Sequence, residues 1–413
     1  MMNLLNKLKK YITPYNIIVF FIIFVGIILR LLVFDKQGGD YTTYKEAMDL
    51  FHKGYNPYNK TISSFGVGGG EHGYAYFPTL LYIQYFVWLI SNWSGIIIST
   101  VILWKIPVLI ADLLILFLIL KSSSNKDKDD RFGLTKIFTG YELLKIIICI
   151  FWLFNPYLIS RYDYSLYDPL FLLCLLLSLK FNEKNSTLSG VFYALSVSLK
   201  TIPIIVLPIL LLKTPRKINF ILSCIFVFIT ISIPFMGNKY DFLNYIDGSI
   251  LVHSERQLQG RPILTWISYN TSSIGINFLQ TDYTSIYSMT ALFASFAIPF
   301  LLYIFKIIKN TNTYILISFA IYLLLTPVLS RTHTLWLLPW SLAYILDRYS
   351  PKKVLKLSVI LLTVWFLIFF YLLDWNRGFE PASDEDKKPI LNNQNTEWEL
   401  KRILRHKYYE FRS

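Results

Sequence analysis

The side chains most suited to chemistry lie in the loops between long apolar runs. Asp40 follows the first apolar run, within the segment FDKQGGDYTTYKEAMDLFHKGYNPYN. A carboxylate at the wall of a cavity can take the proton from a hydroxyl group as that group attacks a substrate. A structural role is the alternative, because residues 41–53 have helical periodicity and a carboxylate immediately before a helix caps its first turn.

A second loop, NPYLISRYDYSLYDP, carries Asp163, Asp168 and Arg161 together with four tyrosines. Ionisable groups at membrane depth are costly, and they usually line a polar cavity or pair with one another. A structural Arg161–Asp163 pair is one explanation, and a substrate-binding role is the other. Two histidines, His253 in HSERQLQGRP and His333 in SRTHTLW, are explained either as substrate ligands or as structural hydrogen-bonding groups.

Several basic residues outside the charged clusters are suited to bind phosphate. Cations bind phosphate strongly at a partly desolvated surface. Any single one is also explained as a long side chain that extends its charge to the membrane surface. The candidate phosphate ligands are Lys200, Arg161, Arg256, Arg261 and Arg331.

The composition predicts that lipid surrounds most of this 413-residue chain. Hydrophobic residues make up 54% of it and charged residues only 16%, more apolar than a soluble globular protein of this length. The net charge of +14 does not indicate nucleic-acid binding, because the basic residues lie in short clusters between apolar runs. Cys149, Cys174 and Cys224 lie inside apolar runs without CxxC spacing, which indicates neither disulfides nor a zinc site.

The chain is expected to be all-α, with about 11 membrane crossings. About 20 helical residues span the hydrocarbon layer, and several runs are shorter, as expected where proline-broken helices surround a cavity. The predicted crossings are residues 16–34, 99–120, 143–159, 169–181, 188–199, 202–212, 218–235, 285–308, 314–329, 335–346 and 354–373.

The positions of Lys and Arg predict the orientation of these crossings. Basic residues prefer short cytoplasmic loops, and the clusters fall on one side if residues 77–93 lie along the outer surface. The alternative is that residues 77–93 span the membrane and the charge rule is broken there. With the first arrangement, Lys200 and both aspartate-bearing loops lie outside. The clusters predicted to be cytoplasmic are residues 7–10, 121–136, 180–184, 213–217, 306–309 and 348–356.

Seven segments in order resemble the GT-C superfamily of membrane glycosyltransferases, which use polyprenyl-phosphate-linked sugars. The resemblance covers most of the chain and is greatest to the mannosyltransferase of GPI-anchor assembly and to bacterial and archaeal polyprenyl-phosphate-mannose enzymes. The segments are GGDYTTYKEA, GYNPY, YFPTLL, KIPVLIADLL, NPYLISRYDYSLYDPL, GVFYALSVSLKTIPIIVLPILL and TPVLSRTHTLWLLPW.

The resemblance implies a GT-C-type fold with surface-lying helices in the first external loop. Residues 1–236 would form a seven-helix catalytic module including external loop 35–95. A large external loop (237–284), C-terminal transmembrane helices (285–374) and a polar tail (375–413) would follow.

The implied activity is inverting transfer of a sugar, with mannose favoured, from a polyprenyl or dolichyl monophosphate to an acceptor hydroxyl. Asp40 matches the catalytic base, while Asp168 and Lys200 match further site residues. The acceptor would be a glycan, glycolipid or glycoprotein. The site would face the outside or a lumen, and a prokaryotic plasma membrane is favoured over the endoplasmic reticulum. The candidate substrate-binding residues are Asp163, Asp168, Lys200, Arg256, Arg261, Arg331 and His333.

No cofactor or metal is expected. The GPI enzyme has two acidic residues one apart in its first loop, whereas Gly38 and Gly39 precede Asp40 here. A monophosphate donor also has no obvious need for a divalent ion. The rival functions are a lipid-linked sugar transporter or flippase and a surface-glycan polymerase or ligase. A flippase would need no base and would favour inverted repeats, which the sequence lacks.

Overall fold

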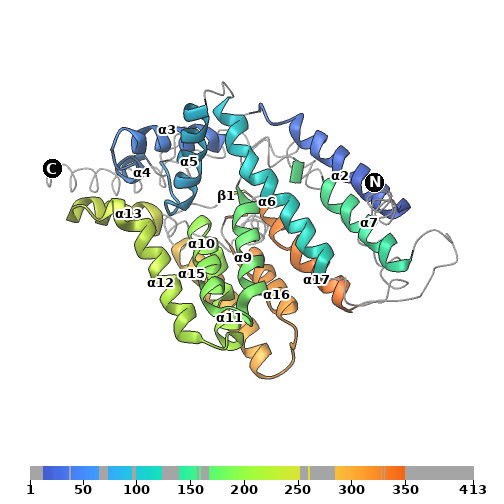
Figure 1. Ribbon diagram of the computed structural model, residues 1–413. Helices are drawn as coiled ribbons and strands as arrows, with labels where there is room; N and C mark the ends of the chain where they lie inside the picture. The colour runs from blue at the N-terminus through green and yellow to red at the C-terminus, as the bar shows by residue number, and fades with distance from the viewer. Residues whose placement is uncertain are drawn as a thin grey trace, which may run out of the picture.

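Helices make up nearly all the secondary structure in the computed structural model of the chain (Figure 1). The structure describes residues 13–36, 39–64, 73–94, 99–122, 139–155, 158–159, 167–251, 259–260, 284–326, 328–329 and 331–348. The expectation of a mostly helical protein is therefore confirmed. The predicted crossing at 354–373 and the polar tail lie outside the described residues.

The first half of the described chain contains two long helices, α2 and α6, and several shorter ones. The elements are α2 (Pro14–Leu31), α3 (Gly39–His52), α4 (Tyr58–Ser64), α5 (Thr79–Ser94), α6 (Thr100–Ser122), α7 (Gly140–Leu153), α9 (Asp168–Asn182) and α10 (Ser186–Leu199).

The second half consists of helices, short 3₁₀ segments and two very short strands. The elements are η2 (Ile202–Val206), α11 (Leu207–Lys213), α12 (Lys217–Ser232), η3 (Ile233–Phe235), α13 (Lys239–Ser249), β1 (Gln259–Gly260), α15 (Thr284–Ile304), α16 (Thr311–Leu325), β2 (Val328–Leu329), η6 (Arg331–Trp336) and α17 (Leu338–Arg348).

Side-chain caps fix where several helices begin. The Thr13 hydroxyl accepts a hydrogen bond from the backbone N–H of Asn16, and Pro14 starts α2, where its missing N–H is no loss. Thr139 and Glu142 form a reciprocal capping box at the start of α7. Such caps satisfy backbone donors that would otherwise have no partner at a helix start.

The predicted crossing at 202–212 is not one continuous helix. It begins as the 3₁₀ segment η2 and continues as α11, with Pro203 and Pro208 each in the first turn of its element. A proline in the interior of an α-helix removes a backbone hydrogen bond and clashes with the preceding turn. The two prolines therefore explain the break.

Within the described residues, three helices are long and apolar enough, by length and composition, to cross a membrane. They are Pro14–Leu31, Thr100–Lys121 and Lys217–Phe235. Four shorter apolar helices, Ser186–Leu199, Ile202–Lys213, Ser288–Ile304 and Thr311–Leu325, lie in the same part of the chain as further predicted crossings.

Small residues allow close approach between neighbouring helices. A Cβ atom at Gly190 of α10 would lie 2.4 Å from the carbonyl oxygen of Phe220 in α12. Between α9 and α10, the Ser178 hydroxyl donates to the Ser189 carbonyl and the Ser196 hydroxyl to the Phe171 carbonyl. Such small polar residues are typical of helix interfaces in membranes.

Four helices, α3, α4, α5 and α13, gather at one end of the bundle (Figure 1). Aromatic side chains fill the space between them, with the Tyr58 ring 5.2 Å from that of Tyr245. The buried Tyr58 hydroxyl donates a hydrogen bond to the Tyr76 carbonyl, 2.6 Å away. Burial raises the pKa of Tyr58 well above its ordinary value, so this phenol stays protonated and remains a donor.

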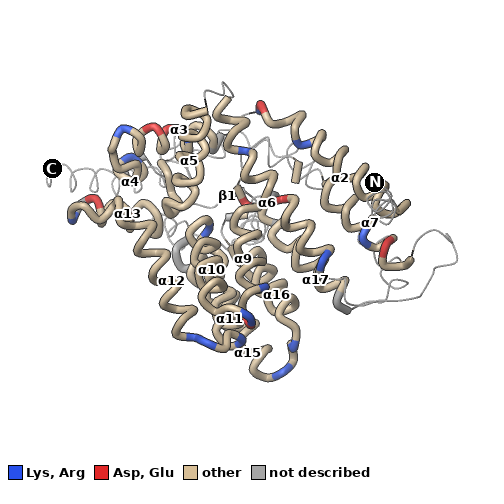
Figure 2. Tube along the Cα trace, in the orientation of Figure 1, with Lys and Arg blue, Asp and Glu red and all other residues tan. Residues whose placement is uncertain are grey.

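Basic turns lie at the opposite end of the bundle (Figure 2). Lys213, Arg216 and Lys217 occupy the α11–α12 connection, and Lys306 and Lys309 lie between α15 and α16. The α9–α10 turn reaches the same end, since the Glu183 carboxylate lies 3.9 Å from the Lys213 ammonium.

Candidate active site

Asp168 and Lys200 form an ion pair where α9 begins and α10 ends. The Lys200 ammonium donates to the Asp168 carboxylate across 2.6 Å, and the exposed fractions of the two side chains are 19% and 4%. Asp168 is the first residue of α9, where the helix dipole favours a negative charge. The two side chains lie 32 residues apart in the sequence, and the α9–α10 hairpin brings them together.

Aromatic rings surround the Lys200 ammonium. The nitrogen lies 4.5 Å from the ring centroid of Trp336 and 5.9 Å from that of Phe171. The His333 ring stacks on Trp336 at 4.3 Å between centroids. Contacts of this kind between a cation and an aromatic face are favourable and fix the position of the ammonium. The structure thus gathers three of the predicted site residues, Asp168, Lys200 and His333, around Trp336.

The indole of Trp336 also brings a hydrogen-bond donor to this cluster. The side chain is almost fully buried, and its Nε1–H has no hydrogen-bond partner among the described residues. A buried donor without a partner carries a penalty that a ligand acceptor would remove. Trp336 is not one of the predicted site residues, because neither tryptophan of the segment TLWLLPW lies in a pattern that indicates a site.

Asp40 lies in the first turn of α3, which begins at Gly39. The prediction that Asp40 lies immediately before the helix is therefore wrong, because the helix begins one residue earlier. A carboxylate in the first turn is still favoured by the helix dipole. One turn further along α3, the Tyr44 ring lies 5.2 Å from that of Tyr167, the residue before Asp168. The helix that carries Asp40 thus contacts the start of α9. The Asp40 side chain lies outside the described residues.

A short parallel pairing joins two residues of the segment after α13 to the segment before His333. Gln259 pairs with Val328 and Gly260 pairs with Leu329. Arg261 follows this ladder directly on one strand, and Arg331 lies two residues beyond it on the other. The side chain of Arg331, and the whole of Arg261, Asp163, Arg256, Arg161 and His253, lie outside the described residues.

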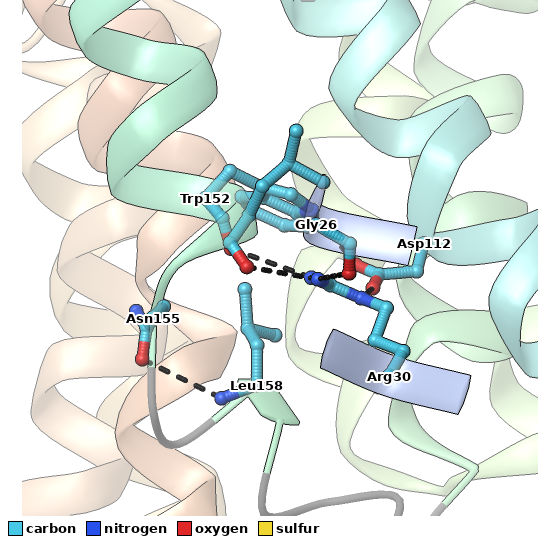
Figure 3. Close-up of polar contacts among 7 residues, drawn as sticks. Gly26, Arg30, Asp112, Trp152, Asn155 and Leu158 are labelled. Carbon is cyan, nitrogen blue, oxygen red and sulfur yellow. Dashed lines mark hydrogen bonds and ion pairs between the residues drawn. The ribbon is translucent and has the colours of Figure 1, made fainter. Parts of the chain in front are cut away.

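A buried ion pair that the sequence did not indicate joins α2 to α6 (Figure 3). Arg30 Nε donates to Asp112 Oδ2 at 2.6 Å, with both side chains 0% exposed. The indole N–H of Trp152 in α7 donates to the second carboxylate oxygen of Asp112 at 2.7 Å. The guanidinium also donates to the carbonyl oxygens of Gly26 and Leu153, at 2.9 Å each.

This network fixes the C-terminal end of α7, the helix that precedes Asp168 in the sequence. Figure 3 shows Arg30 pointing toward that end, with Asn155 and Leu158 in the segment beyond it. Gly26 makes the approach possible, because a Cβ there would lie 2.8 Å from the Leu153 Cβ. The signal that could have found Arg30 and Asp112 is their charge inside apolar runs, which in a membrane protein usually marks a functional or paired group.

A second buried cation, Lys105 of α6, binds the turn that follows α2. Its ammonium donates to the carbonyl oxygens of Val33 and Lys36 at 3.0 and 2.6 Å, and the residue is 2% exposed. These carbonyls belong to the segment that leads from α2 toward Asp40. A cation just beyond a helix C-terminus also complements the helix dipole.

Among the described residues, no group of three or more His, Cys, Asp and Glu side chains could hold a metal ion. The polar chemistry of the described cluster is that of one paired ammonium, one carboxylate, an imidazole and an indole N–H. Such a set is suited to bind an anion or a hydroxyl-rich ligand.

Comparison of the chain with protein-family models, with curated proteins and with solved structures finds no match.

Proposed function

We propose that this protein is an inverting glycosyltransferase that moves a sugar, with mannose favoured, from a polyprenyl monophosphate to an acceptor hydroxyl. The observation that carries the proposal is the position of the Lys200 ammonium, which pairs with the buried Asp168 carboxylate and lies over the ring of Trp336. The indole N–H of Trp336 has no hydrogen-bond partner among the described residues. A phosphate ester or a sugar hydroxyl would supply the acceptor that this N–H needs.

In the proposed reaction, Asp40 removes the proton from the acceptor hydroxyl as its oxygen attacks the anomeric carbon. The bond between that carbon and the phosphate oxygen breaks, and its electron pair leaves with the polyprenyl phosphate. Fixed positive charge from Lys200 stabilises the charge that develops on the leaving phosphate. The contact between Tyr44 and Tyr167 supports a common site, because it joins the helix of Asp40 to the start of α9.

Arg261 and Arg331 are proposed to complete the phosphate site, because they follow the paired strands β1 and β2 closely in the sequence. His333, which stacks on Trp336, is proposed to orient the phosphate or the acceptor. Asp163 and Arg256 remain predicted substrate ligands from the sequence. These residues would bind substrate without a metal ion or an organic cofactor.

We further propose a GT-C-type fold with about 11 crossings and a site that faces the outside or a lumen. The position of the basic turns supports this orientation. The basic turns gather at the end of the bundle opposite α3, α4, α5 and α13 (Figure 2), and basic residues prefer the cytoplasmic side.

The proposed surface position of α5 rests on its contacts. Thr79 bonds to Ser198 in the last turn of α10, and the Tyr82 hydroxyl donates to the Ile231 carbonyl near the end of α12. Further along α5, the Trp88 ring lies 4.4 Å from that of His52 in the last turn of α3. Both halves of α5 therefore contact elements at one end of the bundle.

The direct test is to incubate the purified protein with polyprenyl-phosphate mannose and, separately, polyprenyl-phosphate glucose, in the presence of candidate acceptors. Mass spectrometry should detect a product heavier than the acceptor by one hexose, together with free polyprenyl phosphate. Movement of the intact donor across a vesicle membrane without any transferred hexose would contradict the proposal and favour a flippase.

A further inference from the structure

Helix α6 contacts the chain on both sides of Asp40. Before Asp40, the ammonium of Lys105 binds the carbonyl oxygens of Val33 and Lys36. After Asp40, the Tyr41 hydroxyl forms a 2.7 Å hydrogen bond with the Thr100 hydroxyl, and the Tyr41 ring lies 5.3 Å from that of Trp104. The two flanks of Asp40 are therefore attached to the first two turns of one helix.

These attachments are buried and are themselves held in place. Tyr41, Trp104 and Lys105 are each 5% exposed or less. Thr100 and Trp104 lie four residues apart, so they share one face of α6. The Trp104 indole donates to the Gln84 carbonyl of α5 at 3.2 Å, and the Gln84 amide donates to the Tyr167 hydroxyl at 3.0 Å.

This chain of contacts links the start of α3 to the start of α9. It runs from Tyr41 through Trp104 and Gln84 to Tyr167, the residue before Asp168. The same helix α6 thus relates the segment carrying Asp40 to the residues beside the Asp168–Lys200 pair.

Packing alone does not explain a buried lysine at position 105. A buried ammonium loses its hydration, and an apolar side chain of similar length would fill the space without that penalty. The ammonium, unlike an apolar side chain, has several N–H donors that can bind two carbonyl groups in the turn after α2. A base must be held within a fraction of an ångström of its working position, so fixing this turn has a direct catalytic benefit.

We propose that Lys105 is a positioning residue for Asp40, acting through the turn between α2 and α3, with Thr100 and Trp104 fixing the other flank. The catalytic meaning of this inference rests on the proposed function. The attachment of the segment to α6 does not depend on that function.

The test compares Lys105→Met, Lys105→Arg and Lys121→Met in the full-length protein. Methionine keeps an unbranched chain but has no donor, arginine keeps the donors, and Lys121 is an exposed lysine near the other end of α6. Two measurements are made: amide hydrogen exchange of the peptide covering residues 33–47, and kcat and KM for sugar transfer.

For Lys105→Met, exchange in residues 33–47 should be about tenfold faster, since bonds to a charged donor are lost. The value of kcat should fall about 100-fold with misplacement of the base, while KM for the donor changes less than about threefold. Lys105→Arg should restore most of both losses, and Lys121→Met should match the wild type.

The inference is overturned if Lys105→Met leaves the exchange of residues 33–47 unchanged, or if its loss lies in KM rather than kcat. If Lys105→Met does not fold, Thr100→Val, which removes the Tyr41 hydrogen bond, should give the same pattern in weaker form; unchanged exchange in this variant would equally overturn the inference. A wild-type protein that transfers no sugar contradicts the proposed function alone, because the exchange measurement still decides whether Lys105 holds the segment.

Discussion

Arg30 of α2 and Asp112 of α6 form an ion pair of 2.6 Å from which solvent is fully excluded. The guanidinium also binds carbonyl oxygens of α2 and α7, and the carboxylate accepts from Trp152. Three helices are therefore joined through one pair of charges. Removing either partner would leave the other charge buried without a counter-charge, and this would strongly destabilise the folded protein.

Asp112→Asn should destabilise the protein by about 3–5 kcal/mol, because it leaves the Arg30 guanidinium buried without its counter-charge. Thermal unfolding in detergent measures the loss. The matched control is Glu183→Gln, since Glu183 is 72% exposed and 3.9 Å from Lys213, and this change should cost less than about 1 kcal/mol. The double change Arg30→Met with Asp112→Leu should cost less than Asp112→Asn alone, and equal stability of Asp112→Asn and Glu183→Gln would contradict this account.

Lys200→Met should lower kcat/KM for sugar transfer by about 10²–10³-fold, because a fixed positive charge near the leaving phosphate is lost. Steady-state kinetics with varied donor concentration measure the effect. Lys213→Met is the control, a lysine at the opposite end of the bundle. A similar loss in both variants would indicate general destabilisation and would remove Lys200 from the site.

Trp336→Phe should weaken donor binding about tenfold while leaving unfolding nearly unchanged. Phenylalanine keeps an aromatic face beneath the Lys200 ammonium but lacks the indole N–H that has no described partner. The comparison variant is Trp93→Phe, whose tryptophan is 91% exposed. Wild-type donor affinity in Trp336→Phe would show that no ligand accepts from this N–H.

Cysteines placed at Ser64 and at Ser123 should react from opposite sides of the membrane. Cys149, Cys174 and Cys224 are free thiols, so they are first replaced by alanine. A membrane-impermeant maleimide applied to intact cells should label the cysteine at position 64, and the cysteine at position 123 should react only after permeabilisation. Labelling of both sites from one side would overturn the proposed topology.

The sequence predicted a mostly helical protein, since apolar runs of helical length depend on local composition, but it did not predict α13, which lies in the predicted external loop 237–284. It also placed Asp168, Lys200 and His333 in one compartment, and the structure brings these three together around Trp336. Their roles remain predictions. The sequence predicted a single crossing at 202–212, whereas the structure divides this run into η2 and α11, and the 3₁₀ form of η2 depends on how that segment packs.

Other features could not be predicted because they depend on contacts between distant parts of the chain. Arg30 and Asp112 are 82 residues apart, and Lys105 is 69 residues from the Lys36 carbonyl that it binds. In the sequence, each of these residues is only a charge inside an apolar run, and its partner cannot be identified. The pairing of β1 with β2 involves only two residues on each strand, which is too short to leave a pattern in the sequence.

Asp40→Asn examines the proposed role of Asp40 as the base in sugar transfer. Asparagine preserves size and polarity but cannot take up the proton, so turnover should fall about 10²–10⁴-fold. The control is Asp35→Asn, an exposed carboxylate five residues earlier, which should retain wild-type turnover. The measurement is hexose transfer from polyprenyl-phosphate mannose by protein that unfolds at the wild-type temperature. Loss of transfer in Asp40→Asn alone is the predicted result, and wild-type transfer by that variant would contradict the account.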